Sequence, residues 1–140
     1  MRLYDCINFL INRAQQSVNQ VFKDMLSEYD LTPAQYAVLN SLWEQGDMSP
    51  GELADAIYIE RPAITGILDR LEAKDLIRRV PDSFDRRSIN ICLTAKAASL
   101  KDKILKIVEE AHEYVFKDFS EEQKSELLNM LRMLSTVSTK

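Results

Sequence analysis

The stretch from Ser49 to Thr94 decides the fold: its sequence is SPGELADAIYIERPAITGILDRLEAKDLIRRVPDSFDRRSINICLT. It opens with Ser and Glu spaced as in a capping box, with Pro50 at the first helical position, where a missing N–H is harmless. This predicts a short helix that begins at Pro50. A second proline, Pro62, sits in the first turn of another helix. Two helices therefore follow each other across a turn of only a few residues.

The second helix has one apolar face and one exposed face of small and polar residues. Apolar residues from Ile64 to Leu71 recur at spacings of three and four, which places them on one side of the helix against a core. The opposite side is thin enough to approach a DNA major groove, although a small exposed face also suits packing against a neighbouring helix. On and beside this exposed side the sequence places Arg61, Pro62, Thr65, Gly66, Asp69, Arg70 and Ala73.

Two short strands, Leu76–Val80 and Ser88–Leu93, are predicted after the second helix. Both are rich in apolar or β-branched residues, and the second alternates polar with apolar residues. Between them, Pro81–Asp85 has the composition of a turn, so the pair forms a hairpin with Arg86 and Arg87 at its tip. Such a hairpin is not stable alone and must pack against the helices. Beside a helix-turn-helix, the basic tip favours contact with phosphate or a minor groove over a merely solvated loop.

The order and spacing of these motifs resemble the MarR family of winged-helix transcriptional regulators. The resemblance is strong from about Leu31 to Leu100. It implies a mainly α fold, a winged helix-turn-helix with a two-stranded wing, flanked by long N- and C-terminal dimerisation helices. It also implies a DNA-binding regulator of transcription, by default a repressor that responds to a ligand. The residues that carry the resemblance are Leu31–Tyr36, Glu52–Ala54, Thr65–Leu76, Asp85–Arg87 and Leu93–Thr94.

In the MarR family, the helix at the position of Arg61–Ala73 is the recognition helix, and the Asp-Arg-Arg wing tip enters the minor groove. By this resemblance Asp85 orients Arg87, since an aspartate hydrogen-bonded to a guanidinium fixes the fork without removing its reach. Two residues depart from the family pattern. Gly66 stands where many members have a basic residue, and Asp75 stands where glycine is usual, which predicts a left-handed turn. The resemblance assigns DNA binding to Arg61, Pro62, Thr65, Gly66, Arg70, Arg86 and Arg87.

The length of 140 residues and the 46% hydrophobic content are those of a single domain, 1–140, with its own core. Its winged region is predicted to span 31–94. The formal net charge is −4, but four arginines and two aspartates between 78 and 90 give a local excess of +2. Phosphate affinity depends on where positive charge lies, and so few basic residues favour two copies acting on one duplex. No stretch has the length of a membrane span and the first residues do not resemble a secretory signal, so we expect a cytoplasmic protein.

Amphipathic helices are predicted on both sides of the winged region. One covers roughly Tyr4–Ser27, one follows Thr94 as its N-cap, and a third begins at a capping box opened by Ser120. These regions, 1–30 and 95–140, either fold back on their own domain or pair with a second copy. The amount of apolar surface favours an intertwined homodimer. Two-fold symmetry then predicts a pseudo-palindromic operator with half-sites about one helical turn apart.

Proteins of the MarR family often bind a small ligand, commonly a phenolic or other aromatic anion, between the terminal helices and the winged region. The resemblance makes Arg13, Tyr36 and Trp43 candidates to line such a pocket, together with His112. Each has a structural alternative. Trp43 follows Tyr36 at a spacing typical of a core face, and His112 lies among glutamates on a helix that exposes them to solvent.

The two cysteines, Cys6 and Cys92, raise thiol-based redox sensing as an alternative mode of regulation. Cys6 falls in the predicted first helix, slightly earlier than the cysteine of the family's peroxide-sensing branch, and Cys92 falls in the second strand. Because cytosolic thiols are usually reduced, the ligand response is favoured. Two distant cysteines and one histidine predict neither a zinc site nor another cofactor.

The motifs of an enzyme are missing from the sequence. There is no phosphate-binding glycine loop, no nucleophile elbow and, with a single histidine, no plausible triad, so we expect no enzymatic activity. The stronger rival is a winged helix that binds proteins and not DNA. The two alternatives differ in salt dependence, because DNA binding through the wing arginines must weaken as the salt concentration rises.

Overall fold

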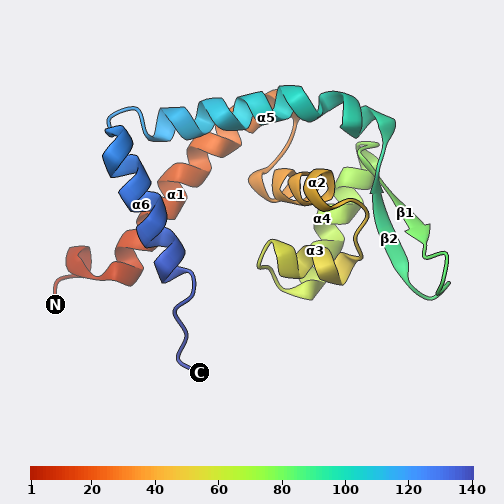
Figure 1. Cartoon of the computed structure of the whole chain (residues 1–140), viewed down its shortest axis with the longest axis horizontal. Helices are drawn as coiled ribbons and strands as arrows, with labels where there is room; N and C mark the ends of the chain where they lie inside the picture. The colour runs from red at the N-terminus through yellow and green to blue at the C-terminus, as the bar shows by residue number, and fades with distance from the viewer.

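The computed structural model describes all 140 residues and consists mainly of helices with one two-stranded antiparallel sheet (Figure 1). This confirms the predicted fold class. Short 3₁₀ turns at Leu3–Asp5 and Ser27–Tyr29 flank the first helix. The elements are α1 Ile7–Leu26, α2 Pro33–Gln45, α3 Pro50–Ala56, α4 Arg61–Ala73, β1 Ile77–Pro81, β2 Ile89–Leu93, α5 Ala95–Val115 and α6 Glu121–Leu134.

The core of the winged region lies between α2, α3, α4 and the inner side of the sheet. The strands pair with Ile77 opposite Leu93, and the backbone of Met48 adds a bridge to Ile91 on the free edge of β2. Pro81, predicted in the turn, is instead the last residue of β1. Because α4 and the sheet share this core, their relative position is fixed by packing. The buried side chains include Val38, Leu39, Leu42, Leu53, Ile64, Leu68, Leu71, Ile77 and Ile91.

The helix starts predicted from capping residues are confirmed. The Ser49 hydroxyl accepts the Glu52 N–H at 3.1 Å, and the Glu52 carboxylate accepts the Ser49 N–H at 3.2 Å. Ser120 forms a second capping box and Thr94 caps α5 through its hydroxyl. Each cap satisfies backbone donors that the helix itself cannot pair, which is why short local motifs fix these boundaries.

The ends of α3 and α4 are built alike, each with a residue in the left-handed region just after the helix. Asp75 has φ of 59°, which confirms the predicted left-handed turn after α4. After α3 the same position holds Tyr58, with φ of 58°. In both motifs the next N–H reaches back to a carbonyl in the last turn, Leu76 to Leu71 and Ile59 to Ala54, both at 3.0 Å. This is the Schellman arrangement, which usually holds glycine.

Replacing Tyr58 by glycine should stabilise the protein by about 1 kcal/mol, because it relieves the left-handed strain of a bulky residue. Little packing is lost, since the Tyr58 side chain is 95% exposed. Equilibrium urea unfolding of the full chain measures the change. Asp75→Gly is the matched control and should gain less, because aspartate tolerates the left-handed region better than tyrosine. Equal gains at both positions would contradict the explanation.

The first helix begins later than predicted. It starts at Ile7, not Tyr4, because Leu3–Asp5 forms a separate 3₁₀ turn and Cys6 is extended at the N-cap. The prediction that Cys6 lies within the helix is therefore wrong. The Cys6 N–H donates to the carbonyl of Leu3, which closes the 3₁₀ turn. The two segments therefore do not form one continuous helix.

The terminal helices form an arm beside the winged region (Figure 1). The C-terminal part of α1 packs against α5 and the core, while no residue of α6 is buried. No helix is long and apolar enough to cross a membrane. Between α1 and α6 lies an open groove of ≈ 440 Å³, nine of whose ten lining residues are hydrophobic: Ile7, Leu10, Ile11, Ala14, Val18, Leu127, Met130, Leu131 and Leu134, with Gln15.

Candidate nucleic-acid interface

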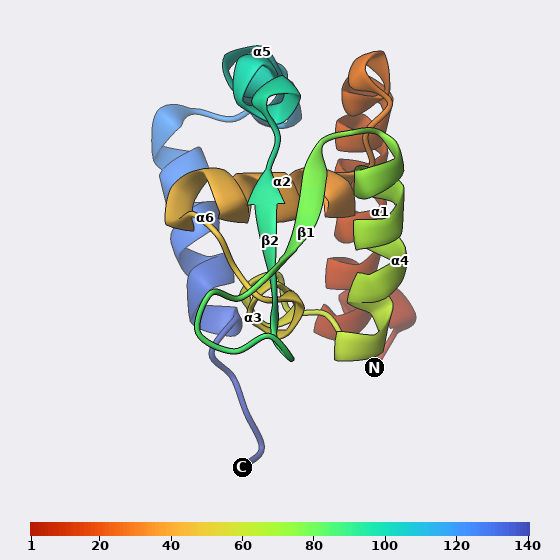
Figure 2. The same cartoon turned by 90° about the vertical axis from the view of Figure 1, so that its right-hand side faces the viewer.

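The N-terminal end of α4 and the tip of the wing lie at the same end of the molecule, away from α5 (Figures 1 and 2). In Figure 2, α4 runs along one side of the hairpin, and the wing loop and the N-terminal end of α4 both lie in the lower part of the view. The shared core holds this arrangement, because the buried faces of α4 and β1 meet there. One surface therefore presents a helix and a hairpin tip together.

The exposed face of α4 has the composition predicted for close approach to a partner. Thr65, Gly66 and Arg70 are exposed, and a Cβ added at Gly66 would meet no atom within 4 Å. Arg70 is in no ion pair. The helix thus offers an open backbone at its centre and a free guanidinium near its end.

Arg61 at the start of α4 is held by the preceding helix. Its Nη2 lies 3.1 Å from Asp55 Oδ2, and its guanidinium sits over Gly51, where an added Cβ would approach it to 3.1 Å. Both charged side chains remain mostly exposed. Asp55 therefore directs Arg61 along the surface between α3 and α4, while an open side of the guanidinium stays available.

Arg79 on β1 is turned inward against α4 and does not add to the basic surface. Its two terminal nitrogens lie 2.8 Å from Asp69 Oδ1 and 2.8 Å from Glu72 Oε1, and the side chain is only 25% exposed. The local excess of +2 that was predicted from the sequence included Arg79, although its charge is balanced by these two acids. The pairing has a second effect, because it neutralises two acids on α4 that would otherwise repel a phosphate backbone.

The wing tip is ordered by hydrogen bonds to its two aspartates. Asp85 Oδ1 accepts the backbone N–H of Arg87 at 3.0 Å and its Nε at 3.4 Å. The Arg87 side chain is nevertheless 93% exposed, and Arg86 has no ion pair. The Ser88 hydroxyl donates to Asp85 Oδ2 at 3.4 Å. Asp85 therefore anchors the backbone of the tip and the stem of Arg87, and the guanidinium projects into solvent.

The candidate ligand residues do not come together in one pocket. Tyr36 and Trp43 lie half-buried on α2 against the core, whereas Arg13 is exposed on α1. Burial, with a smaller effect from the Glu44 charge, raises the pKa of the Tyr36 phenol, so it stays protonated as a hydrogen-bond donor. The indole N–H of Trp43 is buried and donates to no acceptor in the chain.

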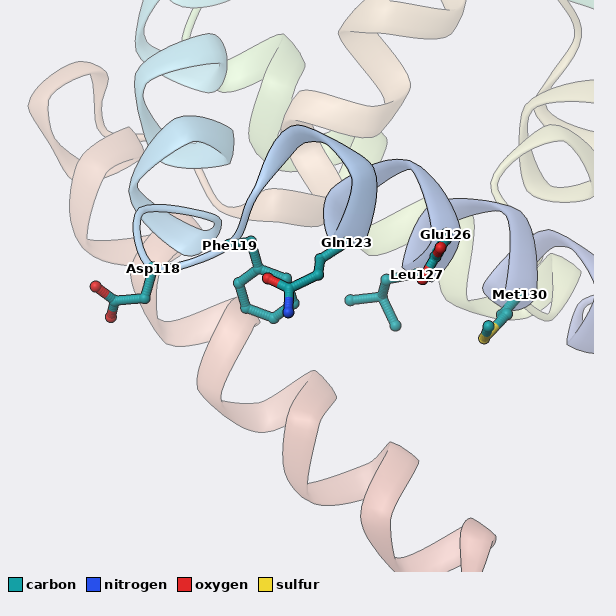
Figure 3. A pocket seen from close by; sticks show the side chains of 6 residues that line it. All are labelled: Asp118, Phe119, Gln123, Glu126, Leu127 and Met130. Carbon is teal, nitrogen blue, oxygen red and sulfur yellow. The ribbon is translucent and has the colours of Figure 1, made fainter.

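Several hollows of the surface lie on the terminal helices. Figure 3 shows one of ≈ 360 Å³ along α6, lined by Phe119, Leu127 and Met130 together with polar residues. Another, of ≈ 370 Å³, includes His112, whose ring packs edge-on against Phe116 at 5.0 Å. His112 is thus partly covered by an aromatic neighbour and is not simply solvated.

The cysteines differ in environment and form no disulfide. Burial raises the pKa of the Cys92 thiol, and a hydrogen bond to Asp47 and the charge of Asp47 raise it further. Since the thiolate is the reactive form, Cys92 is poorly suited to redox sensing. No group of three or more His, Cys, Asp or Glu side chains is placed to hold a metal ion.

The helix pair, the hairpin and their common exposed surface define a winged helix-turn-helix protein. The family model described as MarR family matches residues 31–89. The chain is 30% identical to the uncharacterized HTH-type transcriptional regulator YsmB of Bacillus subtilis, over 76% of this chain and 73% of that protein. It belongs to the MarR family and is a transcriptional regulator.

Solved structures agree with this assignment over nearly the whole chain. BpsR of Bordetella bronchiseptica, whose DNA binding is regulated by 6-hydroxynicotinic acid, superposes with a TM-score of 0.91 at 25% identity, covering 99% of both chains. A mutant MarR from Escherichia coli complexed with operator DNA superposes with a TM-score of 0.85 at 26% identity, covering 91% of this chain and 92% of that one. The terminal helices therefore belong to the same fold as the winged region.

One polar junction was not predicted from the sequence. Lys74, at the end of α4, donates to Gln35 Oε1 at 2.8 Å and to the carbonyl of Asp30. Gln35 is buried and also completes the capping box of α2. The C-terminal end of α4 is thereby tied to the α1–α2 connection and the start of α2. The partners are 39 and 44 residues apart in sequence, and no local pattern reports such a pair.

Proposed function

We propose that this chain binds a pseudo-palindromic operator as a homodimer and represses transcription, with repression relieved by a small aromatic or phenolic effector. In this proposal α4 enters the major groove and the wing enters the adjacent minor groove. The DNA-contacting residues are Arg61, Pro62, Thr65, Gly66, Arg70, Arg86 and Arg87, with Asp85 orienting Arg87. Such a regulator acts where bacterial DNA lies, so we infer that the protein is cytoplasmic.

The observation that carries this proposal is the shared surface of α4 and the wing tip. Arg70 on α4 and Arg86 and Arg87 at the wing tip are free or mostly exposed, while Arg79 neutralises two acids of α4, Asp69 and Glu72. A duplex satisfies all three guanidinium groups through phosphates and groove edges. A partner protein would have to desolvate them without that many fixed anions, so DNA is favoured over a purely protein-binding winged helix.

A homodimer is supported by the terminal helices. α6 has no buried residue, and its apolar side chains face those of α1 across an open groove. An apolar surface that is rimmed by polar residues often marks a site of protein–protein contact. A second copy covers this surface and places two winged regions on one duplex, which offsets the small number of basic residues in each.

An effector is supported by the likeness to BpsR, whose DNA binding is regulated by an aromatic acid. In this chain, Trp43 holds a buried N–H with no acceptor and Tyr36 keeps its phenolic proton, so α2 carries two hydrogen-bond donors, which share no pocket within one chain. Arg13 lies apart on the exposed arm and would reach an effector only across the interface between copies. We keep all three residues as candidates.

Selection of bound sequences from a random duplex library with the full chain tests the function. We expect an enriched inverted repeat with half-site centres about 10 base pairs, or a multiple of that, apart. The affinity for that sequence should fall steeply as the salt concentration rises. Enrichment of no sequence, or an affinity that does not depend on salt, would contradict DNA binding and favour a protein-binding module.

A further inference from the structure

The wing tip carries an apolar side chain that the arginine contacts do not explain. Phe84 is 99% exposed and lies two residues before Arg86. Most other exposed large apolar residues lie on the terminal helices or at the chain ends, where a second copy can cover them. Phe84 belongs to the loop between β1 and β2, and this hairpin lies on the opposite side of the molecule from α6 and the N-terminal part of α1 (Figure 1). Transfer of the exposed phenyl ring from water into a partner at the tip would be favourable, because it removes apolar surface from water.

The backbone on both sides of Phe84 is fixed by hydrogen bonds. Asp82 Oδ1 accepts the N–H of Phe84 itself at 2.8 Å, and the Asp82 N–H donates to the carbonyl of Ser88 at 2.9 Å. On the other side Asp85 accepts the N–H of Arg87 at 3.0 Å. The two aspartates are thus directed at the backbone of the tip. A ring presented on such a rigid turn loses little conformational freedom on binding.

The positive charges of Arg86 and Arg87 beside Phe84 favour DNA over a protein as the partner of the ring. An apolar protein surface that covered the ring would also cover Arg86 and Arg87 and leave two cations without water. The minor groove of a duplex accepts both kinds of group at once, since phosphates line its edges and an apolar wedge can enter between base steps at its floor. Continuity with the surface of α4 also favours DNA.

We propose that Phe84 is a wedge that inserts into the minor groove beside Arg87 and partly unstacks one base step in each half-site. This inference rests on the proposed binding of operator DNA. It makes Phe84 a specificity-determining residue, because the energy needed to open a step depends on its sequence. Flexible pyrimidine–purine steps are opened most easily and stiff A-tracts least easily. The wing therefore selects a deformable step without forming hydrogen bonds to its bases.

Comparison of Phe84→Ala with Phe84→Leu in the full chain tests the wedge. The probe is the duplex enriched by the wild-type protein, labelled at both ends so that energy transfer reports bending. We expect Phe84→Ala to weaken binding about tenfold and to reduce the bend, while Phe84→Leu keeps most of both, because leucine is also an apolar wedge. The slope of affinity against salt should not change, since no charge is removed.

The operator provides the matched control. Replacing the step under the wing by an A-tract should weaken binding of the wild type but have little effect on Phe84→Ala. Wild-type affinity or an unchanged bend for Phe84→Ala would overturn the wedge, as would a fall in the molecular mass of this variant in solution, which would assign the ring to a protein contact. If the wild type binds no duplex at all, the proposed function fails instead, so the two failures are distinguishable.

Discussion

Replacement of Arg87 by alanine should weaken binding to the operator by about 1 to 3 kcal/mol per half-site, which is roughly a 5- to 150-fold loss of affinity for each. The reason is geometric as well as electrostatic. Asp85 holds the stem of Arg87 while the guanidinium is 93% exposed, so the group is oriented before binding and gives up little entropy in the complex. Gly66 leaves the centre of α4 without a side chain, which shifts more of the binding to the wing.

Titration of a labelled operator at several salt concentrations measures this loss. The slope of log affinity against log salt should fall by about one for each phosphate contact that Arg87 makes. Lys103→Ala is the control, because Lys103 is exposed on α5 and in no ion pair, away from the wing. Equal effects of the two substitutions would mean that only the overall charge affects affinity. The orientation of Arg87 by Asp85 would then make no contribution.

The parts of the fold that could be predicted from the sequence are those decided by neighbouring residues. Capping boxes located the starts of α3 and α6. The left-handed turn at Asp75, in contrast, was predicted from the resemblance to the MarR family, in which glycine is usual at that position. The start of α1 was misplaced, because the amphipathic pattern runs on through Leu3–Asp5 although the backbone there is a 3₁₀ turn. Side-chain periodicity reports a face and does not distinguish one continuous helix from two short segments.

In the candidate site, too, features that depend on local sequence could be predicted, and features that depend on the tertiary fold could not. The exposed side of α4 followed from helical geometry alone. The pairing of Arg79 with Asp69 and Glu72 did not, because the partners are 10 and 7 residues apart and lie on different elements. The strain at Tyr58 was also missed, since a tyrosine carries no signal for a left-handed backbone. Charges that the tertiary fold brings together decide which arginines are free, and a count along the chain cannot report this.

Replacement of Leu131 by glutamate should dissociate the proposed dimer and strongly weaken binding to the full operator. Leu131 lines the groove between α1 and α6 and is 41% exposed within one chain, and the proposed dimer would bury it. An unpaired carboxylate in such an interface carries a desolvation penalty of several kcal/mol. The fold of each chain should survive, because no residue of α6 belongs to the core.

Light scattering and operator titration together test this prediction. The wild type should have twice the chain mass of 16.1 kDa, and Leu131→Glu should have the mass of one chain. Val80→Glu is the matched control for mass, because Val80 is equally exposed at 41% but lies on β1, outside the groove. Loss of the second copy removes the effective concentration that links two half-sites, so affinity for the full operator should fall about 10²- to 10⁴-fold while a single half-site is bound as weakly as before. A dimeric Leu131→Glu variant with wild-type affinity would place the interface elsewhere.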